Sequence, residues 1–371
     1  YTPPTGYLAL STANLPEPTI SPADDASPED YFGTLLWTGD GTNDRTIATG
    51  ESGVVGDVNF TPDFVWAKRR SSSANHCLVD VIRTAPQRLI SNSTAAEDAF
   101  GLGSFTTGGF VSPSSNTSQN DSSETFVAWN WKANGSGVSN TDGDITSQVS
   151  ANTTSGFSIV SYTGNGSVDQ TVGHGLNTAV SFGIIKDRDT NSNNNQWQIF
   201  HTGAGDNYGY FTTAAFTGTA GAYPTTGDDT TITIGRTGNN VKNTNESGDR
   251  YIAYLFADVE GFSKFGSYTG NGSSDGVFVF CGFRPAFVMV KRTNSAAAWY
   301  MYDDKRNSYN LVENVLQAQD SAAEITSANN AMDFTSNGFK LRGGGGTANG
   351  SGDTYIFMSF AENPFKYSLA R

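Results

Sequence analysis

Cysteine and histidine are scarce in this sequence. The 371 residues include two cysteines, Cys77 and Cys281, and three histidines. A secreted disulfide scaffold would carry more cysteines, so we expect folding in a reducing cytoplasm with stability from packing. Only His76 has a possible zinc ligand close to it in the sequence, the adjacent Cys77; His174 and His201 have none at zinc-ligand spacing. Adjacent residues of a strand point to opposite faces, so His76 and Cys77 could not share a metal ion. The sequence therefore predicts no zinc centre.

Charged residues are also scarce, at 16% of the chain against about 25% in an average globular protein. Acidic residues outnumber basic ones by 36 to 22, which gives a net charge of −14. An acidic surface repels phosphate backbones, so we do not expect nucleic acid as a partner. No run approaches the roughly 18 apolar residues of a membrane span, so we do not expect membrane insertion either.

Sequence motifs of catalysis are missing as well. The chain has no GxSxG elbow, no P-loop and no GxGxxG before a helix, and the glycine run at 343–346 lacks a lysine. A glycosidase-type pair of carboxylates could form from many acidic residues, but no pair stands out. We therefore expect no enzyme activity and no cofactor, with a polysaccharide depolymerase as the alternative left open.

Two acidic turns are weak candidates for calcium. They are Asp40-Gly-Thr-Asn-Asp44 and Asp142-Gly-Asp144, which offer oxygen ligands on flexible backbone. Neither matches the EF-hand loop, and ordinary polar turns are the main interpretation. We expect a fold that does not depend on metal.

Glycine and aromatic residues are abundant. The chain has 42 glycines, 24 phenylalanines and 15 tyrosines. Glycine and asparagine favour tight turns, and aromatic residues favour strands. The composition therefore predicts an all-β protein.

One module occurs three times along the chain. Each copy has an opening turn motif, then an apolar run that ends in basic residues, and then a closing run. The turn motifs are WTGDGT from Trp37 and YTGNGS from Tyr162 and Tyr268; the apolar runs are FVWAKRR, FGIIKDR and FVMVKR; the closing runs are ETFVAWNW, DRYIAYLF and DTYIFMSF. An array of this kind more often holds, spaces or binds than catalyses.

The closing runs align without gaps. Three positions correspond: Phe126, Tyr251 and Tyr355; Trp129, Tyr254 and Met358; Trp131, Phe256 and Phe360. The first trio is spaced by 125 residues (251 − 126) and 104 residues (355 − 251), more than the roughly 20–50 residues of solenoid repeats. We therefore expect each copy to bury its own core, with the first trio facing equivalent cores.

These observations predict three tandem β-sandwich domains of the concanavalin or jelly-roll type. The expected parts are the end of a preceding domain with a proline-rich linker (1–30), domain 1 (31–134), a linker (135–155), domain 2 (156–258), and domain 3 with a C-terminal tail (261–371). Because the chain opens without methionine, we expect it to be part of a longer polypeptide.

Within each copy the turn motif suits a type I′ hairpin. The apolar runs show little alternation and are expected to be buried on both faces. Their lysines, Lys68, Lys186 and Lys291, are expected to reach solvent with only their stems packed. Residues 310–319 are expected to form a short helix. The tryptophans of the aligned runs are expected in the core rather than on a sugar-binding face: Trp129, Trp131, Trp197 and Trp299.

The quoted motifs resemble a known repeat domain. The succession YTGNGS, GLNTAVSFGIIKDRD or GFRPAFVMVKR, W-x-x-[YF], FTSNGFKLR and YIAYLFA or YIFMSFAENPF resembles repeats of tail-fibre-like structural proteins of bacteriophages, particularly marine and cyanobacterial ones. The resemblance covers about residues 31–366 and is looser in copy one, which lacks the W-x-x-[YF] aromatic. The opening YTPPTGYLALSTANLPEPTI resembles the end of a SPRY-like domain.

The resemblance implies a virion structural protein in a tail fibre or tail appendage, assembled in the host cytoplasm among other virion proteins. It implies no catalytic residues. Binding of host-surface glycans and a homotrimer are further expectations, since phage fibres are commonly three-fold. The alternatives are a head fibre or capsid decoration protein and a non-viral extracellular lectin or adhesin module.

Overall fold

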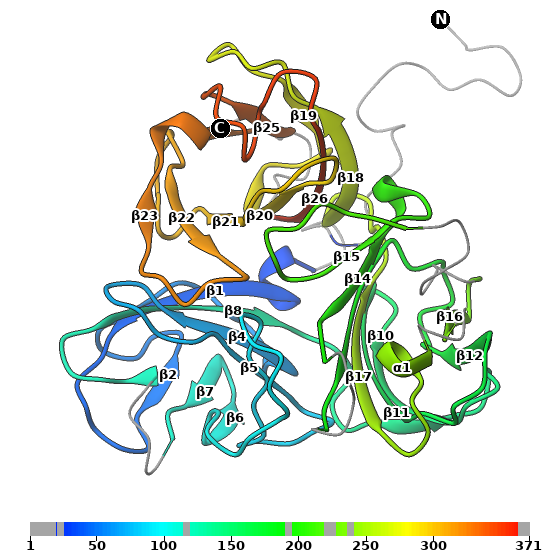
Figure 1. Cartoon of the computed structure of the whole chain (residues 1–371). Coiled ribbons are helices and arrows are strands. Elements are labelled where there is room, and N and C mark those ends of the chain that lie inside the picture. Colours follow the sequence, from blue (N-terminus) through cyan, green and yellow to red (C-terminus); the bar gives the residue numbers. More distant parts are fainter. Residues whose placement is uncertain are drawn as a thin grey trace, which may run out of the picture.

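A computed structural model describes Ile20 and residues 26–113, 119–189, 195–218, 228–235 and 241–362. The described part is all-β, built from antiparallel sheets in three successive units (Figure 1). Unit 1 spans residues 26–134, unit 2 residues 135–258 and unit 3 residues 259–362. Most of the expected preceding segment and the tail beyond residue 362 lie outside the described residues.

The units contain eight, nine and nine strands in the described part of the chain. Unit 1 has β1 (Phe32–Thr38), β2 (Thr46–Ala48), β3 (Val54–Val55), β4 (Phe64–Arg69), β5 (Cys77–Asp80), β6 (Ser104–Thr106), β7 (Gly109–Val111) and β8 (Thr125–Trp131). Unit 2 has β9 (Val138–Asn140), β10 (Ser147–Asn152), β11 (Phe157–Thr163), β12 (Gln170–Gly173), β13 (Phe182–Asp187), β14 (Gln198–His201), β15 (Tyr208–Gly209), β16 (Thr231–Ile234) and β17 (Arg250–Phe256). Unit 3 has β18 (Ser263–Thr269), β19 (Phe278–Phe280), β20 (Pro285–Arg292), β21 (Trp299–Asp303), β22 (Asn314–Gln317), β23 (Ile325–Thr326), β24 (Met332–Thr335), β25 (Gly338–Leu341) and β26 (Thr354–Ala361).

Helices among the described residues are short. They are η3 (Pro28–Asp30), η5 (Thr202–Ala204), α1 (Val241–Thr244) and η6 (Ala328–Asn330). None of these helices has the length and apolar character needed to cross a membrane. The helix expected at 310–319 is wrong, because this stretch contains β22, which pairs with β21 and β23.

The three units repeat one strand order. In each, the closing strand lies between the first strand and the apolar strand, which pairs in turn with the next strand: β1-β8-β4-β5, β11-β17-β13-β14 and β18-β26-β20-β21. The first trio also has equivalent partners, since Phe126, Tyr251 and Tyr355 each pair with the aromatic residue of the turn motif. Their rings stack on it with centroids 5.1, 5.1 and 4.9 Å apart. The predicted repeat is confirmed.

The turn motif does not form a hairpin. After β1, β11 and β18 the chain crosses to a second, smaller sheet of the same unit. A buried asparagine holds each crossing: Asn120, Asn245 and Asn349 each accept from a backbone N–H of the turn and donate to a turn carbonyl. Among the central turn residues only the second glycine has positive φ, whereas a type I′ turn requires two such residues. The hairpin prediction is wrong for this reason.

The expected linker at 135–155 is part of unit 2. Strands β9 and β10 extend its main sheet by pairing beside β11. In β10 Ser147, Val149 and Ala151 share one face, and Gln148 on the other face is exposed, so this segment packs into the unit despite its polar composition. A hairpin forms between β24 and β25 of unit 3, with Ser336 and Asn337 at its turn.

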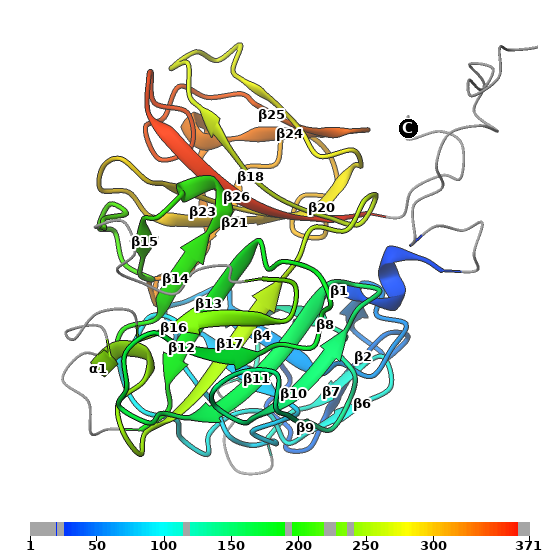
Figure 2. The same cartoon turned by 90° about the vertical axis from the view of Figure 1, so that its right-hand side faces the viewer.

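Each unit is a sandwich with an apolar core of its own between its larger and smaller sheets. A fourth core lies between the units and takes residues from all three. Figure 2 shows how the main sheet of unit 3 lies across those of units 1 and 2. The apolar strands are buried on both faces, as predicted, because one face serves the core of the unit and the other the common core.

Equivalent aromatic residues meet at the centre of the common core. The rings of Trp131, Phe256 and Phe360 lie 5.7 to 6.3 Å apart, centroid to centroid, in all three pairs. Because these residues occupy one aligned position, the units are arranged around a pseudo-threefold axis that passes near this triad. The chain therefore builds from three repeats what a trimer would build from three subunits.

Candidate functional site: the seams between the units

Polar side chains concentrate where one unit meets the next. Each unit reaches into its neighbour in the same rotational sense: unit 1 into unit 3, unit 2 into unit 1, and unit 3 into unit 2. We call these contacts seams 1–3, 2–1 and 3–2, naming the donating unit first.

A buried lysine crosses every seam. Lys68, Lys186 and Lys291 are at most 1% exposed, so the prediction that they reach solvent is wrong. Each ammonium donates to a carbonyl of its own unit and to one of the neighbouring unit, and the neighbouring acceptors are Ser321 (3.2 Å), Thr94 (3.4 Å) and Thr213 (3.2 Å). Carbonyls rather than carboxylates thus satisfy these ammonium groups.

Burial disfavours the charged form of these lysines. It lowers the pKa of Lys68 and Lys186 to about 8 and that of Lys291 to about 7. Nearby carboxylates oppose the shift at Lys68 and Lys186. A neighbouring arginine lowers the pKa of two of the lysines further: Arg69 that of Lys68 and Arg292 that of Lys291. The lysines are therefore structural groups whose charged form the fold disfavours.

An aromatic donor also crosses every seam. The indole N–H of Trp197 donates to the carbonyl of Ile90 at 2.9 Å, and that of Trp299 to Tyr210 at 2.8 Å. In unit 1 the equivalent position is His76, whose Nε2 lies 3.0 Å from the carbonyl of Gln317. Its Nδ1 accepts from an indole N–H of its own unit at 2.8 Å, which leaves the proton on Nε2. Histidine replaces the aromatic residue that copy one lacks.

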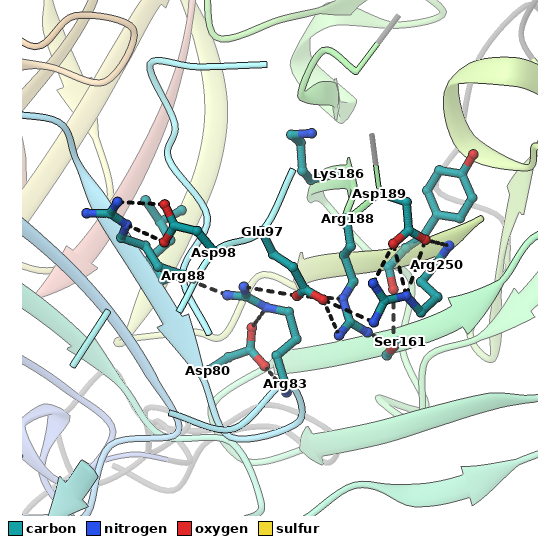
Figure 3. A network of polar contacts seen from close by, with 12 residues as sticks. Asp80, Arg83, Arg88, Glu97, Asp98, Ser161, Lys186, Arg188, Asp189 and Arg250 are labelled. Atoms are coloured by element: carbon teal, nitrogen blue, oxygen red, sulfur yellow. Dashed lines mark hydrogen bonds and ion pairs between the residues drawn. The ribbon is translucent and has the colours of Figure 1, made fainter. Parts of the chain in front are cut away.

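Seam 2–1 has a buried ionic centre (Figure 3). The guanidinium Nε of Arg83 donates to Asp80 at 2.6 Å, and both side chains are fully buried. The hydroxyl of Tyr254, from the closing strand of unit 2, donates to the same carboxylate at 2.8 Å and accepts from Arg83 at 3.0 Å. Tyr254 thus completes a pair that belongs to unit 1.

Seam 1–3 repeats this centre with equivalent residues. Arg306 Nε donates to Asp303 at 2.6 Å, and the indole N–H of Trp129 donates to the same carboxylate at 3.0 Å. Trp129 and Tyr254 occupy the same position of the closing run. A glutamate extends each centre outward: Glu324 contacts Arg70 at 2.8 Å, and Glu97 contacts Arg188 at 3.0 Å.

Seam 3–2 has the same geometry without the charges. His201 stands where the other seams have aspartate, Ala204 where they have arginine, and Met358 where they have Trp129 or Tyr254. His201 Nε2 lies 3.0 Å from the carbonyl of Phe357, and burial lowers its pKa to about 4, so the ring is neutral. The centre of this seam is held by packing and a neutral hydrogen bond.

The candidate residues from the sequence lie elsewhere. Asp40 bonds to Thr42 and Asn120, Asp142 to Asn140, and Asp144 to Thr171. Among the described residues, Asp44 makes no hydrogen bond or ion pair with these side chains. In the described ranges no three histidine, cysteine or acidic side chains form a group that could hold a metal ion. Trp129, Trp131, Trp197 and Trp299 are at most 2% exposed, so their prediction as core residues is confirmed.

Sequence reasoning missed the ionic centres and the role of the lysines. A signal was present: D-x-x-R begins at the last residue of the strand after the apolar strand in copies one and three, as Asp80–Arg83 and Asp303–Arg306. A lysine at the end of all three apolar runs was a second one. Neither pattern shows that the residues take a further partner from another copy, because the seams form only when the three units are assembled.

Comparison with known proteins agrees with the single body seen here. No curated protein matches the sequence. One family model spans residues 27–364 and so includes all three units and their seams. The chain belongs to the family described as a domain of unknown function, DUF7483.

Proposed function

We propose that this chain is a structural part of a bacteriophage virion, namely a segment of a tail fibre or tail appendage. The observation that carries the proposal is that the ionisable side chains of the seams serve to join the units. Lysines, histidines and the aspartate–arginine pairs of the seams are buried and bonded across units, which joins three repeats into one body. Buried polar contacts between repeats suit a protein that must stay rigid. The resemblance of the motifs to tail-fibre-like repeats also supports a virion structural protein.

Recognition of host-surface glycans is part of the proposal. Strand β19 exposes Phe278 and Phe280 by 44% and 64%, while Val279 between them is buried. The two rings therefore stand on one face of an edge strand in unit 3. Exposed aromatic rings of this kind offer stacking surfaces, and loops and edges of rigid scaffolds commonly carry recognition.

Placement in the particle tests the proposal. Antibodies against the chain, coupled to gold, should label purified phage at the tail in electron micrographs, and mass spectrometry should find the chain in particles. Label on the capsid would favour a head fibre or decoration protein instead. Absence from particles of a phage that expresses the chain would refute the virion role and favour the lectin or adhesin alternative.

Glycan binding needs a separate test. Wild-type protein and Phe280→Ala should be compared on an array of host polysaccharides, with Val138→Ala as a control for an exposed apolar residue in unit 2. Loss of binding in Phe280→Ala alone would support the stacking surface. Binding to no glycan would remove this part of the proposal and leave the virion role standing.

The expected homotrimer stays a prediction. One chain already supplies three units around one axis, so a trimer of chains would add a second level of symmetry. Light scattering of the isolated chain tests it, and a 39.4 kDa monomer at tens of micromolar would count against it.

A further inference from the structure

One position differs in charge between the units. The residue after the seam lysine is Arg69 in unit 1, Arg292 in unit 3 and Asp187 in unit 2. The strand registers make these residues equivalent, because each pairs with the aromatic residue of the first trio, Phe126, Tyr355 or Tyr251.

In units 1 and 3 the arginine faces the acidic residue that begins the closing run. Arg292 contacts Asp353 at 2.9 Å, and Arg69 contacts Glu124 at 3.9 Å and also Asp121. Two units thus hold a positive charge against this carboxylate. The acidic residue recurs in unit 2 as Asp249, but there the opposite side chain is Asp187.

Unit 2 therefore holds two buried carboxyl groups in contact. Asp187 and Asp249 are 1% and 6% exposed, and their side chains interact. One oxygen of each, Oδ2, has no hydrogen-bond partner. Burial and then the charge of Asp187 raise the pKa of Asp249. Two like charges out of water are unfavourable unless a cation lies with them.

The basic groups nearby are engaged elsewhere. Lys186 donates to the main-chain carbonyl of Asp187, not to its carboxylate. Arg188 is bonded to Glu97 and Ser161, and Arg250 to Asp189 and Glu97. Glu246 adds negative charge beside Asp249. No guanidinium or ammonium among the described residues takes the place of the missing arginine.

We propose that Asp187 and Asp249 bind a divalent metal ion of the calcium class, which occupies the place of the guanidinium in units 1 and 3. Carboxylate oxygens without nitrogen or sulfur ligands suit hard cations. Two carboxylates supply only part of the roughly six to eight oxygens that calcium takes, so water completes the shell and the Kd is on the order of 10⁻⁴ to 10⁻³ M. The inference departs from the metal-independent fold expected from the sequence, and it does not depend on the proposed function.

Terbium luminescence provides a direct measurement. Tyr251 pairs with Asp187 across the strands, so its ring can sensitise a terbium ion bound at the carboxylates. Metal-stripped wild-type protein should give terbium emission that calcium displaces. Asp187→Asn and Asp249→Asn should each weaken this signal at least tenfold. Asp142→Asn, an acidic turn of the same unit, should leave it unchanged.

Thermal melting gives an independent result. Calcium at 10 mM should raise the Tm of the wild-type protein by roughly 1–3 °C over protein in EDTA. Asp187→Arg should abolish this response and raise the metal-free Tm, because it restores the ion pair of units 1 and 3. If Asp187→Arg does not fold, the near-isosteric Asp249→Asn decides.

Two outcomes would overturn the proposal. One is terbium emission of equal affinity in wild type and both asparagine variants, which places the ion elsewhere. The other is a wild-type Tm that responds to pH but not to calcium, which means that the pair shares a proton only.

Discussion

Seams 2–1 and 1–3 have a buried aspartate–arginine pair at their centre, and seam 3–2 has none. Aspartate stands at Asp80 and Asp303 in the former. The equivalent His201 of the latter is neutral and lies against the rings of Phe182 and Phe265. The backbone arrangement is nonetheless the same in all three. The arrangement of the three units therefore does not require the aspartate–arginine pairs.

The features common to all seams are the buried lysine, an aromatic or histidine donor to a carbonyl of the next unit, and the central triad. Buried ion pairs are often no more stabilising than apolar side chains of similar volume, because desolvation offsets their attraction. We interpret these common features as the interactions that hold the three units around the pseudo-threefold axis. The ionic centres then specify which faces of the units meet. Four predictions test this difference between the seams.

The largest effect is expected from loss of one charge in an ionic centre. Asp80→Asn and Asp303→Asn should each lower the free energy of unfolding by about 3–5 kcal/mol, because a buried guanidinium then lacks its counter-ion. His201→Asn, at the equivalent position of seam 3–2, should cost only about 1–2 kcal/mol, since neutral hydrogen bonds are lost. Urea unfolding measures all three, and equal losses would contradict the distinction between seams.

Transplanting the ionic centre into seam 3–2 is the second test. His201→Asp alone should cost about 3 kcal/mol as an unpaired buried charge. Adding Ala204→Arg and Met358→Tyr supplies the partners seen in seam 2–1 and should recover about 2 kcal/mol of this loss. A mutant cycle gives the coupling energy. Additive losses would mean that seam 3–2 does not share the geometry of the others.

The seam lysines predict a pH dependence that differs between seams. An unfolded lysine has a pKa of about 10.4, whereas that of Lys291 in the fold is about 7. Between these values the unfolded chain binds more protons, so stability rises with pH, by up to about 1.4 kcal/mol per unit for this group. Below pH 7 the contribution of this group is constant.

The difference in unfolding free energy between wild type and Lys291→Met isolates this effect. It should grow in favour of wild type from pH 7 upward. The same difference for Lys68→Met and Lys186→Met should begin to grow about one pH unit higher, because burial lowers the pKa of these lysines only to about 8. Differences that stay constant from pH 6 to 10 would show that the lysines are not buried in solution.

The smallest effect is expected at the edge of the ionic seams. Arg70 of seam 1–3 contacts Glu324, whereas Thr293 stands at the equivalent place of seam 3–2. Arg70→Thr should cost about 0.5–1 kcal/mol, because the ion pair is partly exposed. Thermal melting at low and high salt measures it. A loss above about 2 kcal/mol would show that this pair is part of the buried centre.

Much of the fold within one unit could be predicted from the sequence. The gapless closing runs placed Phe126, Tyr251 and Tyr355 correctly, and the apolar runs were correctly taken as strands buried on both faces. What covers the second face could not be predicted, because a run apolar on both sides does not show which neighbour it packs against. Trp131, Phe256 and Phe360 meet only once three units are assembled.

The errors have physical causes. Lys68 was expected in solvent because a lysine is rarely buried unpaired, but one of the two carbonyls that satisfy it comes from another unit. Residues 135–155 were expected to be a linker because polar composition concealed their alternation. The expected hairpin at the turn motif failed because Asn120 and its equivalents direct the chain to a second sheet. In each case a long-range partner overrides the local pattern.

The central claim is that three repeats form one cooperative body around a common core. Native-state hydrogen exchange in low urea, read by mass spectrometry on β8, β17 and β26, tests it most directly. We expect the three closing strands to exchange with one common opening free energy and one dependence on urea. Three distinct opening free energies, one for each unit, would contradict it and make the units independent domains.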